Sequence, residues 1–212
     1  LWGDRLLFGS RDDHLHCLAL DDGRPLWALP CGGQDVDSTP AVVGDRAFFG
    51  AEDTHLYCID IDGKVVWRHA TGGSIESSPA VVEGKAYVGS YDGYLHCVGA
   101  EDGAAAWRFP TGDDTDSSPV VVGDVVYIGC ENGFLYAVDR RDGTLLWRYR
   151  AGAGIWGTPA VADGRVLVGA DDALVHCVDA ASGEVVWRTE VSAGMWASPT
   201  VVDGVLVIGD WD

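Results

Sequence analysis

The chain has 212 residues, of which 33 are acidic and 14 basic, giving a formal net charge of −19 at pH 7. Because nucleic acid and anionic bilayer surfaces are also negative, this charge disfavours both as partners. No apolar run approaches the length needed to span a bilayer. Much of the acidic excess lies in turns, which favours turn chemistry and solubility, with adaptation to high salt as the alternative.

A unit of about forty residues repeats along the whole chain. In each copy an apolar run ends in Gly, an acidic or Asn turn and a short apolar run follow, and a second Gly turn precedes a Trp. The tryptophans are Trp27, Trp67, Trp107, Trp147 and Trp187. Repetition at this period indicates a tandem array. We therefore interpret residues 1–212 as one domain with repeats at 1–34, 35–73, 74–113, 114–153, 154–193 and, in part, 194–212.

The elements of one repeat, taken in chain order from residue 74, are predicted to be four strands. The apolar segments are short and β-branched, and they predict strands over 78–82, 85–89, 95–98 and 105–109. Glu83-Gly84 closes the first hairpin, Asp92-Gly93 is predicted to form a two-residue type I′ turn, and Gly103 closes the third hairpin. Four antiparallel strands in about forty residues make one blade of an all-β propeller.

The tryptophan segments carry a resemblance to a known family. Residues 19–27, 138–147 and 178–187 read ALDDGRPLW, VDRRDGTLLW and VDAASGEVVW. They resemble the tryptophan-docking motif of the PQQ-binding-like β-propeller repeat family, in which the motif locks adjacent blades together. The resemblance covers the whole chain and implies a structural docking role for the five tryptophans. The family includes quinoprotein dehydrogenases, non-catalytic outer-membrane assembly scaffolds and sensor domains, so it indicates the fold more sharply than the function.

Both ends of the chain interrupt the repeat inside a blade. Residues 1–9 align with 42–50, and residues 210–212 correspond to 90–92, which lead into a hairpin. This pattern predicts a fragment of a longer protein. A ring closed on five blades would leave the segment 205–209 unused, whereas the resemblance implies propellers of seven or eight blades. We expect a partial ring, completed by missing blades or by self-association because exposed blade faces are apolar.

Cysteine and histidine also follow the repeat. Cys17, Cys58, Cys97 and Cys177 share one repeat position, and three of them follow a His. Equivalent positions on neighbouring blades are too far apart for disulfides and do not converge on one metal ion. We expect these cysteines to be small buried apolar residues, with no metal site. Cys31 and Cys130 lie outside this register and are candidate free thiols.

One repeat position changes its chemistry along the chain. Three residues before each Pro, at the start of the first strand, stand Asp37, Glu76, Asp116, Trp156 and Trp196. First strands of blades run beside the central axis, so these side chains should gather at one mouth of the channel. Carboxylates attract cations and indole faces stack on cations or rings, which favours a cationic or planar ligand. Nearby hydroxyls are expected to assist, from Ser38, Ser77, Ser117, Thr158 and Ser198. The alternative is that these are solvated or packed structural residues.

Two functions remain open at this point. The first is a non-catalytic propeller that binds a protein or small ligand as a scaffold or sensor, favoured by uniform blades and short connections. The second is a fragment of a PQQ- and Ca²⁺-dependent quinoprotein alcohol dehydrogenase, in which Trp156 or Trp196 would be the residue stacked on the quinone. The adjacent cysteine pair typical of those enzymes is missing from the sequence, and no catalytic or cofactor-binding residue is assigned. The resemblance favours an exported protein, periplasmic or cell-surface, whereas unpaired cysteines point weakly the other way.

Overall fold

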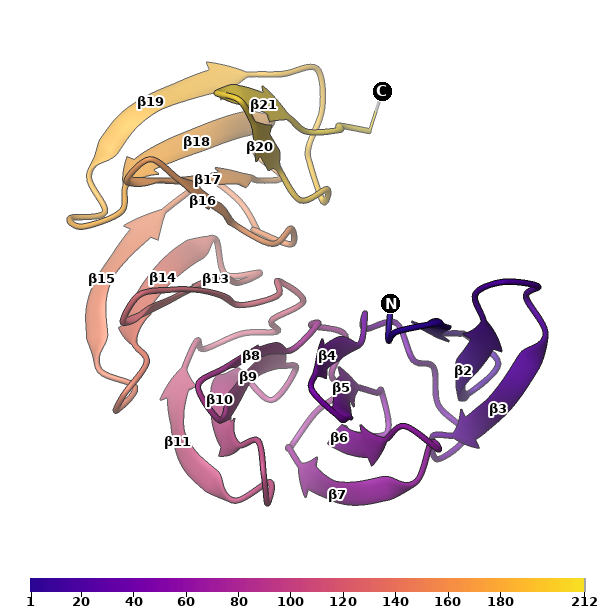
Figure 1. Cartoon of the computed structure of the whole chain (residues 1–212). Coiled ribbons are helices and arrows are strands. Elements are labelled where there is room, and N and C mark those ends of the chain that lie inside the picture. Colours follow the sequence, from indigo (N-terminus) through magenta and orange to yellow (C-terminus); the bar gives the residue numbers. More distant parts are fainter. Residues whose placement is uncertain (212) are drawn as a thin grey trace.

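The computed structural model describes residues 1–211, and every regular element in that range is a β-strand (Figure 1). The first sheet contains β1 (Arg5–Gly9), β2 (His14–Ala19) and β3 (Pro25–Pro30). Three four-stranded sheets follow: β4 (Ala41–Val43), β5 (Arg46–Gly50), β6 (His55–Asp60) and β7 (Val65–Ala70); β8 (Ala80–Val82), β9 (Lys85–Ser90), β10 (Tyr94–Gly99) and β11 (Ala105–Pro110); β12 (Val120–Val122), β13 (Val125–Gly129), β14 (Phe134–Asp139) and β15 (Leu145–Arg150). The last two sheets contain β16 (Ala160–Ala162), β17 (Arg165–Gly169), β18 (Leu174–Asp179) and β19 (Val185–Glu190), and then β20 (Thr200–Val202) and β21 (Val205–Val207). None of these elements is a helix that could cross a membrane.

The sheets are the blades of a partial propeller, which confirms the predicted fold class. Within each four-stranded sheet the strands pair antiparallel in chain order. The short first strands β4, β8, β12, β16 and β20 are neighbours along the inner edge. Figure 1 shows the blades fanned around this edge, with the arc open between β20–β21 and the sheet of β1–β3. Completion of the ring by further blades or by self-association stays a prediction.

Each blade buries its two middle strands. In β9 and β10 the residues from Ala86 to Val88 and from Leu95 to Val98 are buried, whereas the outer strand β11 alternates exposed and covered positions. Side chains from neighbouring sheets meet in these layers, as where Tyr87 and Leu95 pack in one cluster with Val126 and Ile128 of the next blade. The apolar core is therefore a series of layers between blades and not a single centre.

The first hairpins follow the order of their two turn residues. In Glu83-Gly84 both residues have positive φ, 46° and 75°, as a type I′ turn requires. Where the order is reversed, as in Gly44-Asp45 and Gly123-Asp124, only the Gly has positive φ, 59° and 58°, which matches type II′. The position of the single residue without a Cβ thus selects the turn type.

The prediction of a type I′ turn at Asp92-Gly93 is wrong. Ser90 pairs with Tyr94, so the loop has three residues, and of these only Gly93 has positive φ, 77°. Asp92 instead accepts the backbone N–H of Tyr94 at 3.2 Å with its carboxylate, which stabilises the turn without left-handed backbone at Asp92. The first strand, β8, starts at Ala80, two residues later than predicted. The reason is that the N–H of Ser78 bonds to Ser118 Oγ of the next blade and not to its own sheet.

Four tryptophans lie against the next blade. The indole N–H of Trp67 donates to the carbonyl of Ala100 at 3.1 Å, and its ring covers Gly103. The same arrangement joins Trp27 to Ile61 and Gly63, Trp107 to Arg140 and Gly143, and Trp147 to Ala180 and Gly183. Trp187 has no such Gly turn against it among residues 1–211 and is 39% exposed.

The six cysteines are buried, and three of the six histidines pair with an aspartate four residues earlier. All six cysteines are buried and unpaired, and burial raises the pKa of the Cys97 thiol to about 11. The His that precedes Cys97 places Nε2 at 3.0 Å from the carboxylate of Asp92, four residues earlier. The same pair recurs as Asp12 with His16 and Asp172 with His176. These pairs tie the hairpin to the middle strand and do not converge on one centre.

Candidate functional site

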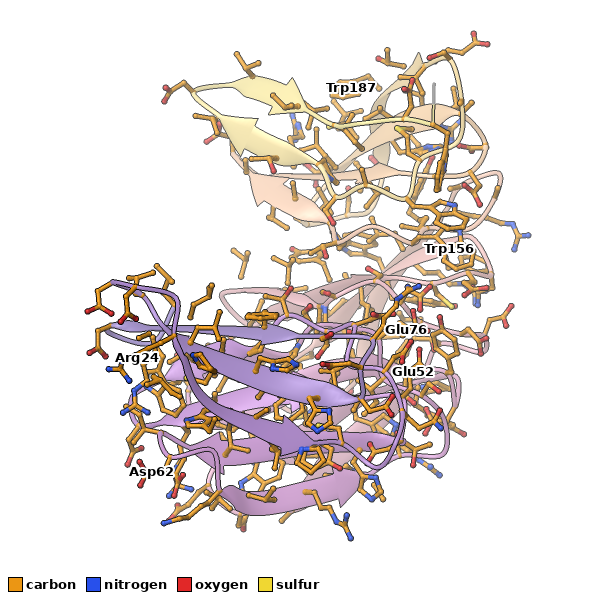
Figure 2. The ribbon with its side chains drawn as sticks, turned by 90° about the vertical axis from the view of Figure 1, so that its right-hand side faces the viewer. Arg24, Glu52, Asp62, Glu76, Trp156 and Trp187 are labelled. Atoms are coloured by element: carbon orange, nitrogen blue, oxygen red, sulfur yellow. The ribbon has the colours of Figure 1, made fainter. Side chains whose placement is uncertain are left out.

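The residues singled out at the start of the first strands lie on one face of the arc, which we call the mouth face. Figure 2 places Glu52, Glu76 and Trp156 along one side of the ribbon, and Arg24 and Asp62 on the opposite side. A second series of residues, two positions after the Gly that ends each second strand, lies beside the first series. This series comprises Arg11, Glu52, Tyr91, Glu131, Asp171 and Trp211.

The N-terminal part of the mouth face is acidic but partly neutralised. Arg11 Nη2 lies 3.2 Å from Asp37 and its Nε lies 4.0 Å from Asp35. Carboxylate oxygens of Asp35, Asp37 and Glu52 lie within 4.8 Å of one another. Burial raises the pKa of Glu52, and the nearby carboxylates of Asp35 and Glu76 raise it further. The guanidinium of Arg11 thus already serves as the counterion of this group.

The middle part of the mouth face carries carboxyl groups with raised pKa values. Burial raises the pKa of Asp116 to about 6, although a hydrogen bond from Tyr91 opposes the shift. Burial together with the charges of Asp116 and Asp114 raises the pKa of Glu131 to about 7. Oδ1 of Asp116 is buried and accepts no hydrogen bond from the described residues. Burial raises the pKa of the Tyr91 hydroxyl, and its interactions with Asp116 and Glu76 raise it further.

The C-terminal part of the mouth face is aromatic. The rings of Trp156 and Trp196 stack, with centroids 4.9 Å apart and planes at 25°. Both indole N–H groups donate to Asp171, one to each carboxylate oxygen, and both distances are 2.9 Å. Trp196 also meets Trp211 nearly edge-on, at 4.7 Å and 89°. Trp196 and Trp211 are 51% and 62% exposed.

The five predicted site residues therefore form a row and do not meet at one point. Trp156 and Trp196 contact each other, Glu76 and Asp116 share Tyr91, and Asp37 is paired with Arg11. The sequence analysis missed the second series, although the fixed spacing from the strand-ending Gly was a usable signal. This series supplies the hydrogen-bonding partners of three residues in the first, Arg11 for Asp37 and Asp171 for both Trp156 and Trp196.

The expected hydroxyl contacts to a ligand are wrong for three of the five residues, and those of Thr158 and Ser198 stay a prediction. Ser38, Ser77 and Ser117 are buried at the inner edge. Ser117 Oγ accepts the N–H of Gly129 and donates to the carbonyl of Gly157 in the next blade, both at 3.0 Å. Ser198 Oγ accepts the N–H of Thr158 at 2.9 Å. Because the hydroxyls of Ser38, Ser77 and Ser117 satisfy buried backbone groups, they are not free for a ligand.

The mouth face does not fit PQQ. That cofactor is a planar quinone with three carboxylates, and Arg11 is the cation that the mouth series offers against Glu52, Glu76, Asp116 and Glu131. An anionic group placed there would meet like charge. The stacked ring of Trp196 already covers one face of Trp156. The arrangement favours cations over anions.

Comparisons with known proteins agree with the propeller architecture. A family model described as "Outer membrane protein assembly factor BamB" matches residues 2–74, 55–155 and 131–212. The crystal structure of the computationally designed Ika8 protein superposes with a TM-score of 0.83 and 15% identity, over 98% of this chain and 65% of that chain. BamB from Moraxella catarrhalis gives a TM-score of 0.63 and 19% identity, over 98% of this chain and 79% of that chain. This chain thus spans less than two thirds of the designed protein. No curated protein matches it by sequence. At these identities the structural likeness shows the fold alone.

Proposed function

This chain belongs to the family of the outer membrane protein assembly factor BamB, and from that premise we propose that it is a non-catalytic propeller that binds a partner protein. The proposal places the contact on the mouth face and the partner's contribution in a basic segment. An exported location, in the periplasm or at the cell surface, belongs to the same proposal. The role of BamB as an assembly factor supports a protein partner.

The observation that carries this proposal is the uncompensated carboxylate group in the middle of the mouth face. Asp116 holds a buried oxygen without a hydrogen bond, and its neighbours Glu76 and Glu131 are acids. A buried acceptor left without a partner costs about 1 to 3 kcal/mol. An arginine or lysine side chain from a partner would supply the missing donor and a compensating charge. A hollow of about 330 Å³ lined by Tyr91, Asp113 and Asp114 adjoins this group.

The loops support binding over catalysis. The connections after the second strands have the same short form in every blade, and none carries an insertion that could close over a substrate. The raised pKa values of Asp116 and Glu131 would suit acid–base chemistry in another setting. Here they follow first from burial and then from the neighbouring like charges. The mouth face lacks the nucleophile and the positioned base that a reaction would require, among the described residues.

A defined peptide pair tests the proposal. Isothermal titration with an arginine-rich decapeptide should show binding at low salt that weakens steeply as salt rises, while its glutamate counterpart should not bind. Replacing Asp116→Asn or Glu131→Gln should weaken binding by about fivefold or more. Asp62→Asn is the matched control, because Asp62 lies on the opposite side of the ribbon (Figure 2). Equal loss in all three variants, or no binding of the arginine peptide, would overturn the proposal. Saturable quenching of Trp fluorescence by PQQ with Ca²⁺, together with dye-linked alcohol oxidation, would instead establish the dehydrogenase.

A further inference from the structure

We infer that the corner between Trp196 and Trp211 binds a quaternary ammonium group. The two indole rings stand at 89° with centroids 4.7 Å apart, so they form two walls of a corner. Beside them opens a hollow of about 380 Å³ lined by Trp196, Ala197, Gly209, Asp210 and Trp211. Indole faces attract cations through the ring quadrupole, and aromatic corners of this kind are how proteins recognise methylated ammonium groups.

One wall of the corner is held in place before any ligand arrives. Trp196 stacks on Trp156, and its N–H donates to Asp171 Oδ1. Trp156 donates to the other oxygen of the same carboxylate. The ring of Trp196 therefore has a fixed orientation although half of its surface is exposed. A fixed wall reduces the conformational entropy that a ligand must overcome on binding.

The charge around the corner selects a cation, and the two indole faces favour one that carries methyl groups. Asp171 places a negative charge against the indole edges, and both of its oxygens already accept N–H groups. Asp210 adds a second carboxylate, whose Oδ2 accepts the hydroxyl of Ser192 at 2.6 Å. Ala197 has a small side chain and Gly209 has none, so both leave room for methyl groups. A trimethylammonium group needs no hydrogen-bond acceptor and gains from both charge and ring contact.

This inference rests on the proposed binding role of the mouth face, but it concerns its aromatic end and not the carboxylates around Asp116. The arginine peptide and the ammonium group therefore report on different residues. If Asp116→Asn weakens the peptide while the ammonium group shows no binding, the inference fails and the proposed function stands. If the ammonium group binds and the peptide does not, the proposed function fails and the corner remains a small-ligand site.

The test uses choline and its neutral isostere 3,3-dimethylbutan-1-ol, which has the same shape without the charge. In NMR titrations the N-methyl signal of choline should shift upfield and saturate, because the methyl groups would lie over indole faces. The isostere should bind about tenfold more weakly. Trp211→Ala should weaken choline about tenfold, and this variant should fold because Trp211 is 62% exposed. Trp187→Ala is the matched control, an exposed Trp outside the mouth series, and should leave choline binding unchanged.

Three results would overturn the inference. The first is equal binding of choline and the isostere, which would indicate a merely apolar hollow. The second is equal weakening by Trp187→Ala and Trp211→Ala, which would indicate non-specific contact with exposed indoles. The third is the lack of any saturable shift of the choline signal in the unmodified chain. Circular dichroism of each variant checks that the propeller is intact.

Discussion

The indole of Trp67 lies over the α-carbon of Gly103, thirty-six residues later, so closely that a β-carbon on Gly103 would stand 2.7 Å from the ring. Gly103 also has a φ of 68°, in the left-handed region. The docking of one blade on the next therefore requires glycine twice, once for the backbone and once for the contact.

The two requirements can be separated by a pair of alanine substitutions. Gly103→Ala should destabilise the chain by about 2 to 4 kcal/mol, since it adds a steric clash to left-handed strain. Gly23→Ala has nearly the same backbone, with a φ of 70°, but nothing within 4 Å of the added carbon. It should cost only the strain, about 1 to 2 kcal/mol. Guanidinium unfolding measures both values, and equal losses would show that the indole contact carries no weight.

The tryptophan side of the same contact gives a second prediction. Trp107→Ala removes a ring packed on Gly143 and a hydrogen bond of 3.1 Å to Arg140, and should cost about 3 to 5 kcal/mol. Trp187→Ala removes an exposed ring that meets no Gly turn among residues 1–211, and should cost less than about 1 kcal/mol. Thermal unfolding followed by circular dichroism compares the two. Similar losses would contradict the docking interpretation.

Ala173 provides a prediction of opposite sign. It closes the same three-residue loop as Gly93 and Gly133, and it does so with a φ of 58°. Because left-handed backbone costs a non-glycine residue about 1 to 2 kcal/mol, Ala173→Gly should stabilise the chain by up to about 1 kcal/mol after the entropy lost by glycine. Ala105→Gly makes the same chemical change in the extended strand β11 and should destabilise it by about 0.5 to 1 kcal/mol. If both variants lose stability, Ala173 carries no strain.

The carboxylates of the mouth face predict a pH dependence. The pKa of Asp116 is raised to about 6 and that of Glu131 to about 7, above the values near 4 of unfolded chains. Between these values the folded chain binds more protons, so these groups stabilise it in mild acid and that stability is lost as pH rises through 6 and 7. Asp139 acts in the opposite sense, because a hydrogen bond from Arg141 lowers its pKa to about 2. Its contribution is present above about pH 4 and is lost as the pH falls through 2.

Variants isolate the mouth carboxylates from the other titrating groups. Unfolding at pH 5 and pH 8 should show that the unmodified chain loses more stability on going to pH 8 than Asp116→Asn or Glu131→Gln does. The difference should be on the order of 1 kcal/mol per carboxyl, reduced by partial exposure to solvent. Asp62→Asn should behave as the unmodified chain. An identical pH response in all four proteins would show that the crowding at the mouth is relieved in solution.

The fold could be predicted from the sequence because each determinant is local and repeated. A Trp every forty residues, a Gly at most turns and short β-branched runs agree with one another, and the strands lie close to the predicted ranges. Only one of the two series of residues in the candidate site could be predicted from the sequence. Asp37, Glu76, Asp116, Trp156 and Trp196 occur at one obvious repeat position, whereas their partners come from a different strand connection. The spacing from the strand-ending Gly indicates the second series, but only the folded structure shows that Asp171 accepts the indole N–H groups of both Trp156 and Trp196.

The errors have physical causes of the same kind. Asp92-Gly93 has the composition of a two-residue turn, but strand pairing between Ser90 and Tyr94 fixes a loop of three. The buried serines resemble ligand contacts in sequence, yet the inner edge of the propeller contains backbone groups that need them. In both cases backbone hydrogen bonding determined the structure, whereas the prediction had relied on residue type.

The residues that join the blades are different from the residues that face the mouth. This separation affects which positions of such a protein can be substituted. Trp107, Gly143 and Ser117 fix one blade against the next, whereas the mouth position of the same blade, Asp116, makes none of these contacts. Substitution at the mouth therefore leaves the scaffold intact, as the change from acid to indole between Asp116 and Trp156 illustrates within one chain. Each blade supplies one recognition residue that can be substituted without changing the contacts between blades. The binding preference can therefore change one blade at a time along the arc shown in Figure 1.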